Sequence, residues 1–182
     1  MNRILVCLLL TILGTAAIPL AQSASKEFLT PKEIEKVQLA QQIDARVKVY
    51  MEAAAFRLKT ARERFGGVES EPGEPLEFFT VEEMIEGYNR ILQSVMMNLE
   101  DAYQDSSKDR EKVKAALTSL KKGSQNAENA LAVLKKLAEE RLDEKVWDQV
   151  NEAIEITEGA LEGAEFGLSE LSQSPDKNKR EK

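Results

Sequence analysis

The chain has 182 residues, of which 42% are hydrophobic and 31% are charged, and aromatic residues are only 5%. This composition is too apolar for a disordered chain and is typical of long helices within one domain. The formal net charge of −7 disfavours nucleic acid and anionic membrane surfaces as partners.

Residues 1–23 are typical of a signal peptide that is removed on export. Arg3 supplies a positive start, a mostly apolar stretch follows, and Ala21 and Ser23 put small residues where cleavage requires them. A retained membrane anchor is the alternative, although the apolar stretch is short for a spanning helix and holds Pro19 near its end. We therefore expect a protein that is secreted or periplasmic.

Removal of this segment leaves a mature protein with neither histidine nor cysteine, because Cys7 is the only cysteine of the chain. Disulfides, cysteine nucleophiles, serine–histidine relays and zinc sites of the usual Cys/His kind are then excluded. Haem ligation by these residues and the Glu-x-x-His di-iron site of helical bundles are excluded as well. The sequence predicts no enzyme activity, no cofactor and no metal.

Four amphipathic helices are predicted, with apolar positions three and four residues apart. The first begins at Pro31, after a capping box formed by Thr30 and Glu33, and runs to Phe65. A second capping box starts the next helix, and the four expected ranges are 31–65, 81–105, 108–141 and 143–171. In the last helix the expected buried stripe is Trp147, Val150, Ile154, Thr157, Leu161, Ala164, Leu168 and Leu171.

Net charge alternates along these four helices, at +3, −5, +4 and −8. In an up-down-up-down bundle each helix neighbours the one before and after it, so every neighbouring pair would be opposite in sign. We therefore expect an all-α, antiparallel up-down-up-down four-helix bundle of long helices. The signal peptide in 1–23 precedes this bundle, which occupies 24–173, and a polar tail follows in 174–182.

Glycines four residues apart mark the last helix, at Gly159, Gly163 and Gly167. Glycine inside a helix costs about 1 kcal/mol relative to alanine, so the row needs a reason. One reason is close packing of a neighbouring helix, with Gly163 near Gly123 in a simple hairpin. The other is a shallow groove in which a ligand or a partner helix lies on the backbone.

Two further features are candidates for partner binding. The linker between the first two helices is acidic and ends in aromatic residues, which either cover one end of the bundle or bind a partner. The last helix carries an acidic face, which is either simply solvated or meets a basic partner. The candidate residues are Glu69, Glu71, Glu74, Glu77, Phe78 and Phe79 in the linker, and Asp148, Glu152, Glu155 and Glu162 in the helix.

The sequence therefore favours a non-enzymatic scaffold or adaptor whose partner is another protein. A carrier of a small apolar molecule or a cation in the bundle core is the alternative. Membrane attachment is not expected once the signal peptide is removed, and heptad stripes leave the oligomeric state open. The carrier hypothesis places its ligand near Ser124, Ala127, Thr157 and Gly163.

Overall fold

The computed structural model describes residues 28–104 and 109–173, which form five helices and no strand. The predicted all-α class is therefore confirmed for these residues. The expected signal peptide and polar tail lie outside them, and no described helix is both long enough and apolar enough to cross a membrane. The helices are α1 (Pro31–Leu39), α2 (Ile43–Phe65), α3 (Val81–Gln104), α4 (Arg110–Arg141) and α5 (Glu144–Gln173).

Helix starts follow the capping signals of the sequence. The Glu33 backbone N–H donates to the Thr30 hydroxyl, and the Thr30 N–H donates to the Glu33 carboxylate at 2.7 Å. Thr80 and Glu83 make the same reciprocal pair before α3. Both capping boxes satisfy backbone N–H groups that have no partner inside the helix, so local sequence fixes these two boundaries.

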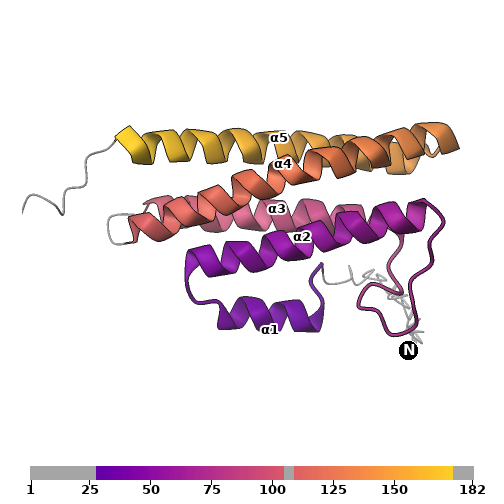
Figure 1. Cartoon of the computed structure of the whole chain (residues 1–182), viewed down its shortest axis with the longest axis horizontal. Helices are drawn as coiled ribbons and strands as arrows, with labels where there is room; N and C mark the ends of the chain where they lie inside the picture. The colour runs from indigo at the N-terminus through magenta and orange to yellow at the C-terminus, as the bar shows by residue number, and fades with distance from the viewer. Residues whose placement is uncertain (1–27, 105–108, 174–182) are drawn as a thin grey trace, which may run out of the picture.

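The predicted helix over 31–65 is wrong, because the chain leaves the helical path at residues 40–42 and forms α1 and α2 separately. α1 folds back alongside α2 (Figure 1). The turn is held by the Arg46 side chain, whose Nε donates to the Ala40 carbonyl at 3.2 Å. Residues 39–42 contain neither glycine nor proline, so the sequence gives no local signal for this break.

A buried ion pair fixes α1 against α2. The Arg57 side chain is 1% exposed and donates to both carboxylate oxygens of Glu33, at 2.9 and 2.8 Å. It also donates to the Ala53 and Phe28 carbonyls. Gly87 of α3 makes room for it, since a Cβ there would lie 3.0 Å from Arg57 Nε. The buried guanidinium therefore joins α1, α2 and Phe28, three residues before α1, into one unit.

The Glu33 carboxyl responds to this environment. Burial alone raises its pKa, but the hydrogen bonds from Arg57 and Thr30 and the charge of Arg57 outweigh burial. The pKa of Glu33 therefore lies below its ordinary value. The charged carboxylate is the form that the fold stabilises.

The order of neighbouring helices differs from the predicted order. Consecutive long helices run in opposite directions, as expected (Figure 1). However, α2 packs against α3 and α4, and α5 packs against α4 and α3, while α3 and α4 meet only slightly and α2 and α5 do not meet. Two helices that are adjacent in the chain, α3 and α4, thus lie across the bundle from each other.

Like-charged helices are consequently neighbours, which contradicts the predicted alternation around the bundle. Within the observed bounds, α2 and α4 carry net charges of +3 and +4, and α3 and α5 carry −4 and −7. Exposed ion pairs contribute only about 0–1 kcal/mol each, so they do not decide which helices stack. The molecule therefore has a basic α2–α4 side and an acidic α3–α5 side.

Side-chain fit, which is worth more than surface charge, accompanies this order. Gly123 of α4 receives Met51 of α2, with the Met51 Cβ 3.6 Å from where a glycine Cβ would be. Between α3 and α5, the buried Tyr88 hydroxyl bonds to the Thr157 hydroxyl at 2.6 Å, and Thr157 in turn donates to the Ala153 carbonyl. Burial raises the pKa of Tyr88 to about 12, although its bond to Thr157 acts in the opposite direction.

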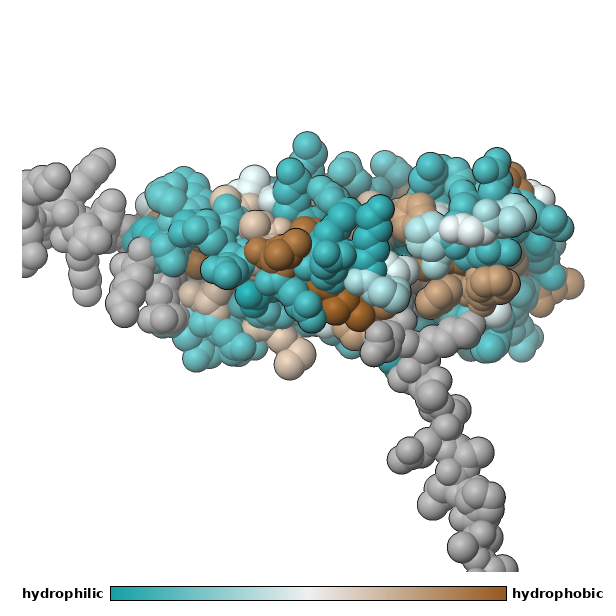
Figure 2. Space-filling view, turned by 90° about the horizontal axis from the view of Figure 1, so that it is seen from below, coloured by the Kyte–Doolittle hydropathy of each residue, from teal (hydrophilic) through white to brown (hydrophobic). Residues whose placement is uncertain are grey.

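The outer surface on the α1 side is mainly hydrophilic, with hydrophobic residues scattered in small groups (Figure 2). An apolar surface also lies between α3 and α5.

Candidate functional site

The face that α5 buries differs from the predicted stripe at every second position. Half of the expected residues are buried, among them Val150 and Thr157, but the large side chains of the other half are only partly covered. The indole of Trp147, for example, is 38% exposed and lies beside Lys135 of α4. In their place α5 buries smaller residues one position earlier, namely Val146, Ala153, Ala160 and Gly167.

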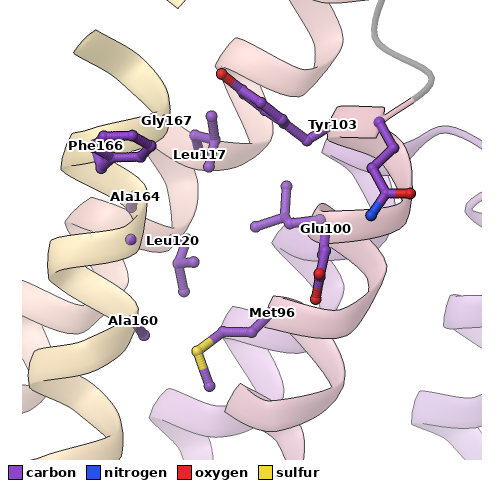
Figure 3. A pocket seen from close by; sticks show the side chains of 12 residues that line it. Met96, Glu100, Tyr103, Leu117, Leu120, Ala160, Ala164, Phe166 and Gly167 are labelled. Atoms are coloured by element: carbon purple, nitrogen blue, oxygen red, sulfur yellow. The ribbon is translucent and has the colours of Figure 1, made fainter. Parts of the chain in front are cut away.

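These small residues leave space between α5 and α3. A cavity of about 490 Å³ lies there, over the C-terminal halves of both helices, and its lining is almost entirely apolar. Figure 3 shows Met96, Glu100 and Tyr103 on one side, facing Ala160, Ala164 and Phe166 across the gap. The walls are completed by Leu99 and Gln104 of α3, Leu117 and Leu120 of α4, and Gly163 and Gly167 of α5.

The cavity opens to solvent. Phe166 at its edge is 68% exposed, although an aromatic ring of this size is normally covered. Glu100, Gln104 and Gly163 are also exposed lining residues. Because both flanking helices are acidic, the opening is an apolar groove between two negatively charged ridges. We call it the α3–α5 groove.

The glycine row divides into packed and open positions. A Cβ on Gly167 would lie 3.0 Å from Leu117, and one on Gly123 would lie 2.3 Å from the Met51 methyl, so these two glycines accommodate neighbouring helices. A Cβ on Gly159 or Gly163 would meet nothing within 4 Å. Packing within the chain therefore does not account for Gly159 and Gly163, and the expected contact between Gly163 and Gly123 is absent, because Gly123 faces α2.

The linker candidates lie away from the α3–α5 groove. The linker lies beside the N-terminal end of α3, on the same side of the molecule as α1, whereas α5 lies on the opposite side (Figure 1). Its backbone is held by Arg64, whose guanidinium donates to the carbonyls of Leu76 and Phe79 and to the Ser70 hydroxyl. Leu76 is buried and Phe79 is partly buried against the core.

Two of the four linker acids interact with the linker itself. The Glu74 carboxylate accepts the Glu71 N–H at 3.2 Å, and the Glu77 carboxylate accepts the Gly73 N–H at 2.7 Å. Glu69 remains exposed, and the Phe78 ring is 80% exposed. These contacts favour the first interpretation of the linker, in which it covers one end of the bundle.

The acidic residues of α5 are all exposed, but they do not form one site. Asp148 lies beside Trp147 near the start of the helix. Glu152 lines a separate polar cavity against α3, with Asn89. Glu155 and Glu162 are exposed on the same helix. In the described part of the chain no group of three or more Asp and Glu side chains is arranged to hold a metal ion.

The region proposed for a ligand inside the core is filled by packing. Ser124 is fully buried, and Thr157 is occupied by its bond to Tyr88. Ala127 lines a different groove, between α2 and α4, together with Gly123. Of the four residues expected near a ligand, only Gly163 lines the α3–α5 groove.

Sequence reasoning missed the α3 side of this groove. The apolar stripe that the sequence predicts for this helix is Met84, Tyr88, Ile91, Val95, Leu99 and either Ala102 or Tyr103. Met96 and Glu100 lie outside that stripe, and Tyr103 was expected only as an alternative at its end. Their role depends on α5 being the neighbour of α3, and the chain order does not reveal this. The signal in the sequence that could have indicated this groove was the pair of glycines without contacts, Gly159 and Gly163.

Comparison with known proteins identifies no relative: no family model, no curated protein and no solved structure matches the chain.

Proposed function

We propose that this protein is an exported, non-enzymatic binding module whose α3–α5 groove holds an amphipathic helix of a partner protein. The proposal includes an intact four-helix bundle built by α2–α5 and removal of the signal peptide. The observation that carries it is the open apolar cavity of about 490 Å³ lined by Gly163, whose Cβ position is empty, as is that of Gly159 one turn earlier in α5.

Shape supports a helix as the occupant. Helix-binding grooves take apolar anchors spaced three, four and seven residues apart, and they are open along their length. Gly159 and Gly163 are one turn apart on the exposed side of α5, so a partner backbone is able to approach α5 closely there. Burying one Leu or Phe anchor in the cavity contributes about 1.5–3 kcal/mol.

Charge specifies the second face of that helix. The flanking helices α3 and α5 carry −4 and −7, so a partner helix with basic residues beside its apolar stripe is favoured and an acidic one is repelled. This is an adaptor role of the kind that the acidic last helix predicts. The partner-binding residues in this proposal are Met96, Glu100, Tyr103, Gly159, Gly163 and Phe166.

The test uses two variants that separate binding from stability. Alanine at Gly159 and Gly163 has no clash within the chain and removes two helix-interior glycines, so each change raises the free energy of unfolding by about 1 kcal/mol. The methyl group at Gly163 projects into the groove, and the one at Gly159 stands on the exposed surface one turn before it, so together they weaken a bound helix. We expect at least tenfold weaker binding of a labelled Leu/Lys amphipathic peptide, measured by fluorescence anisotropy.

The matched control is Ser119→Ala, at a half-buried position of α4 that lines the α2–α4 groove and not the α3–α5 groove, and this change leaves peptide affinity unchanged. A Leu/Glu peptide of the same length shows whether charge selects the partner. If the double glycine variant binds the Leu/Lys peptide as tightly as the wild-type protein, the groove is not the binding site. Cross-linking in the native compartment, compared between these two proteins, then identifies the natural partner.

A second candidate is a carrier of a small apolar molecule, favoured by the cavity volume, which lies within the range of small-molecule sites. A fluorescent naphthalene probe distinguishes the two. A carrier binds the probe stoichiometrically and shows no affinity for the peptide, whereas a helix-binding groove binds the peptide and releases the probe.

A further inference from the structure

A second, polar cavity of about 300 Å³ lies between α3 and α5, closer to their N-terminal ends. It is lined by Glu86, Asn89, Arg90 and Gln93 of α3, and by Gln149 and Glu152 of α5. Nothing in the apolar groove requires these polar residues, so their arrangement needs its own explanation.

Two side-chain oxygens in this cavity have no hydrogen-bond partner among the described residues. They are Oδ1 of Asn89, a residue only 5% exposed, and Oε1 of Gln149. A buried acceptor without a donor costs about 1–3 kcal/mol, which makes such a pair unusual in a well-packed seam. The cavity therefore presents acceptors that a bound group with N–H donors would satisfy.

The charges of the lining favour a cationic donor. Glu86 and Glu152 contribute two carboxylates, and Arg90, which pairs with Glu86 at 2.8 Å, contributes one guanidinium. One negative charge remains in excess at this cavity. A primary ammonium group has one positive charge and three donors, which match the two amide oxygens and the Glu152 carboxylate.

The polar cavity and the apolar cavity lie along the same seam. Four residues of the polar cavity each have a counterpart in the apolar cavity 14 positions later in the same helix. The pairs are Glu86 and Glu100, Asn89 and Tyr103, Gln149 and Gly163, and Glu152 and Phe166. Two heptads return to the same helix face, and at 1.5 Å per residue the two sets are separated by about 21 Å. On α3 the two linings follow one another within one turn, at Gln93 and Met96.

We propose that the polar cavity binds the ammonium group of a lysine on the partner helix, and that this lysine sets the register of the helix in the groove. The inference rests on the proposed function, because it assumes that a helix lies along the seam. A helix that lies along it carries its large apolar anchor and its recognised lysine about 14 residues apart, since both helices rise 1.5 Å per residue.

A peptide series tests the register. Each helical peptide carries one apolar anchor and a single lysine 7, 11, 14 or 18 residues away on the same face, and a further peptide carries the anchor alone. We expect the 14-residue spacing to bind about tenfold more tightly than the 7-residue spacing, and a glutamate at the same position to bind more weakly than the anchor alone.

The protein variant for this test is Asn89→Leu combined with Gln149→Leu. It replaces both unpartnered amides by apolar groups of similar size, which is compatible with folding. The variant should bind every lysine peptide with the affinity of the anchor-only peptide, whose own affinity stays unchanged. Retention of the 14-residue preference in this variant would overturn the inference.

The outcomes separate the two proposals. If all peptides bind equally well regardless of lysine position, the register inference is wrong and the helix-binding function stands. If the anchor-only peptide and the lysine peptides all fail to bind, the proposed function is wrong and the inference is lost with it.

Discussion

Replacing Glu33 by glutamine removes the one carboxylate that neutralises the buried Arg57 guanidinium. Removing one partner of a buried pair costs about 3–5 kcal/mol, because the remaining charge is left without compensation. Glu33 is itself 14% exposed, and glutamine still accepts a hydrogen bond from Arg57, so we expect the lower end of this range. The expected loss is about 3 kcal/mol from a total stability of about 5–15 kcal/mol.

The assay is urea unfolding followed by circular dichroism. With a slope of about 1–3 kcal/mol per molar urea, the loss lowers the midpoint by at least about 1 M. The matched control is Glu35→Gln on the exposed side of α1, which stays within about 0.5 kcal/mol of the wild-type protein. Equal midpoints for Glu33→Gln and Glu35→Gln would show that the buried pair does not hold α1 in place.

A double variant tests whether the uncompensated Arg57 charge causes this loss of stability. Arg57→Met in the Glu33→Gln background removes the uncompensated charge, so it should be more stable than Glu33→Gln alone. If the two changes instead add independently, the ion pair is not the source of the effect.

Three further outcomes are expected. The Glu33 carboxylate stabilises the folded state at pH values above its ordinary pKa of 4.5, and this contribution is lost as the pH falls through the lowered pKa of the folded state. The free energy of unfolding, measured as the pH is lowered, should therefore depend less on pH in Glu33→Gln than in the wild-type protein. Tyr88 should ionise only near pH 12, as a late step in ultraviolet titration that Tyr88→Phe removes; a wild-type titration without a late step would contradict its burial. In a Cys7→Ser background, Met51→Cys with Gly123→Cys should form a disulfide on oxidation, because the two Cβ positions are 3.6 Å apart. Failure of that bond to form would favour the helix order predicted from charge.

The helical class and most helix boundaries of this protein follow from the sequence alone. Capping boxes at Thr30 and Thr80 act within four residues, so local chemistry determines them. Spacing alone also predicts the buried stripe of α4, because its apolar and small residues alternate four and three positions apart. All of them are buried: Val113, Leu117, Leu120, Ser124, Ala127, Leu131, Leu134 and Ala138. Each of these features depends on neighbours in the chain and not on which helices meet.

Tertiary contacts decided the remainder. The break between α1 and α2 depends on Arg57 meeting Glu33, 24 residues away. The face that α5 buries was ambiguous, because Ala153 and Ile154 both fit a spacing of three and four. Burial of the smaller set depends on the approach of α3 and leaves the α3–α5 groove open.

The order of helices around the bundle was the largest error of sequence reasoning, and it determined the site. The net charges of the helices alternate along the chain, but each exposed ion pair is too weak to determine which helices pack together. Contacts such as Met51 against Gly123 are instead made only when the α2–α3 and α4–α5 hairpins pack with α2 beside α4. The sequence thus determined which residues are helical and which faces are apolar. Only the tertiary structure decided that α3 and α5 lie together, because that pairing depends on packing between residues far apart in the chain, such as Tyr88 and Thr157, which are 69 positions apart.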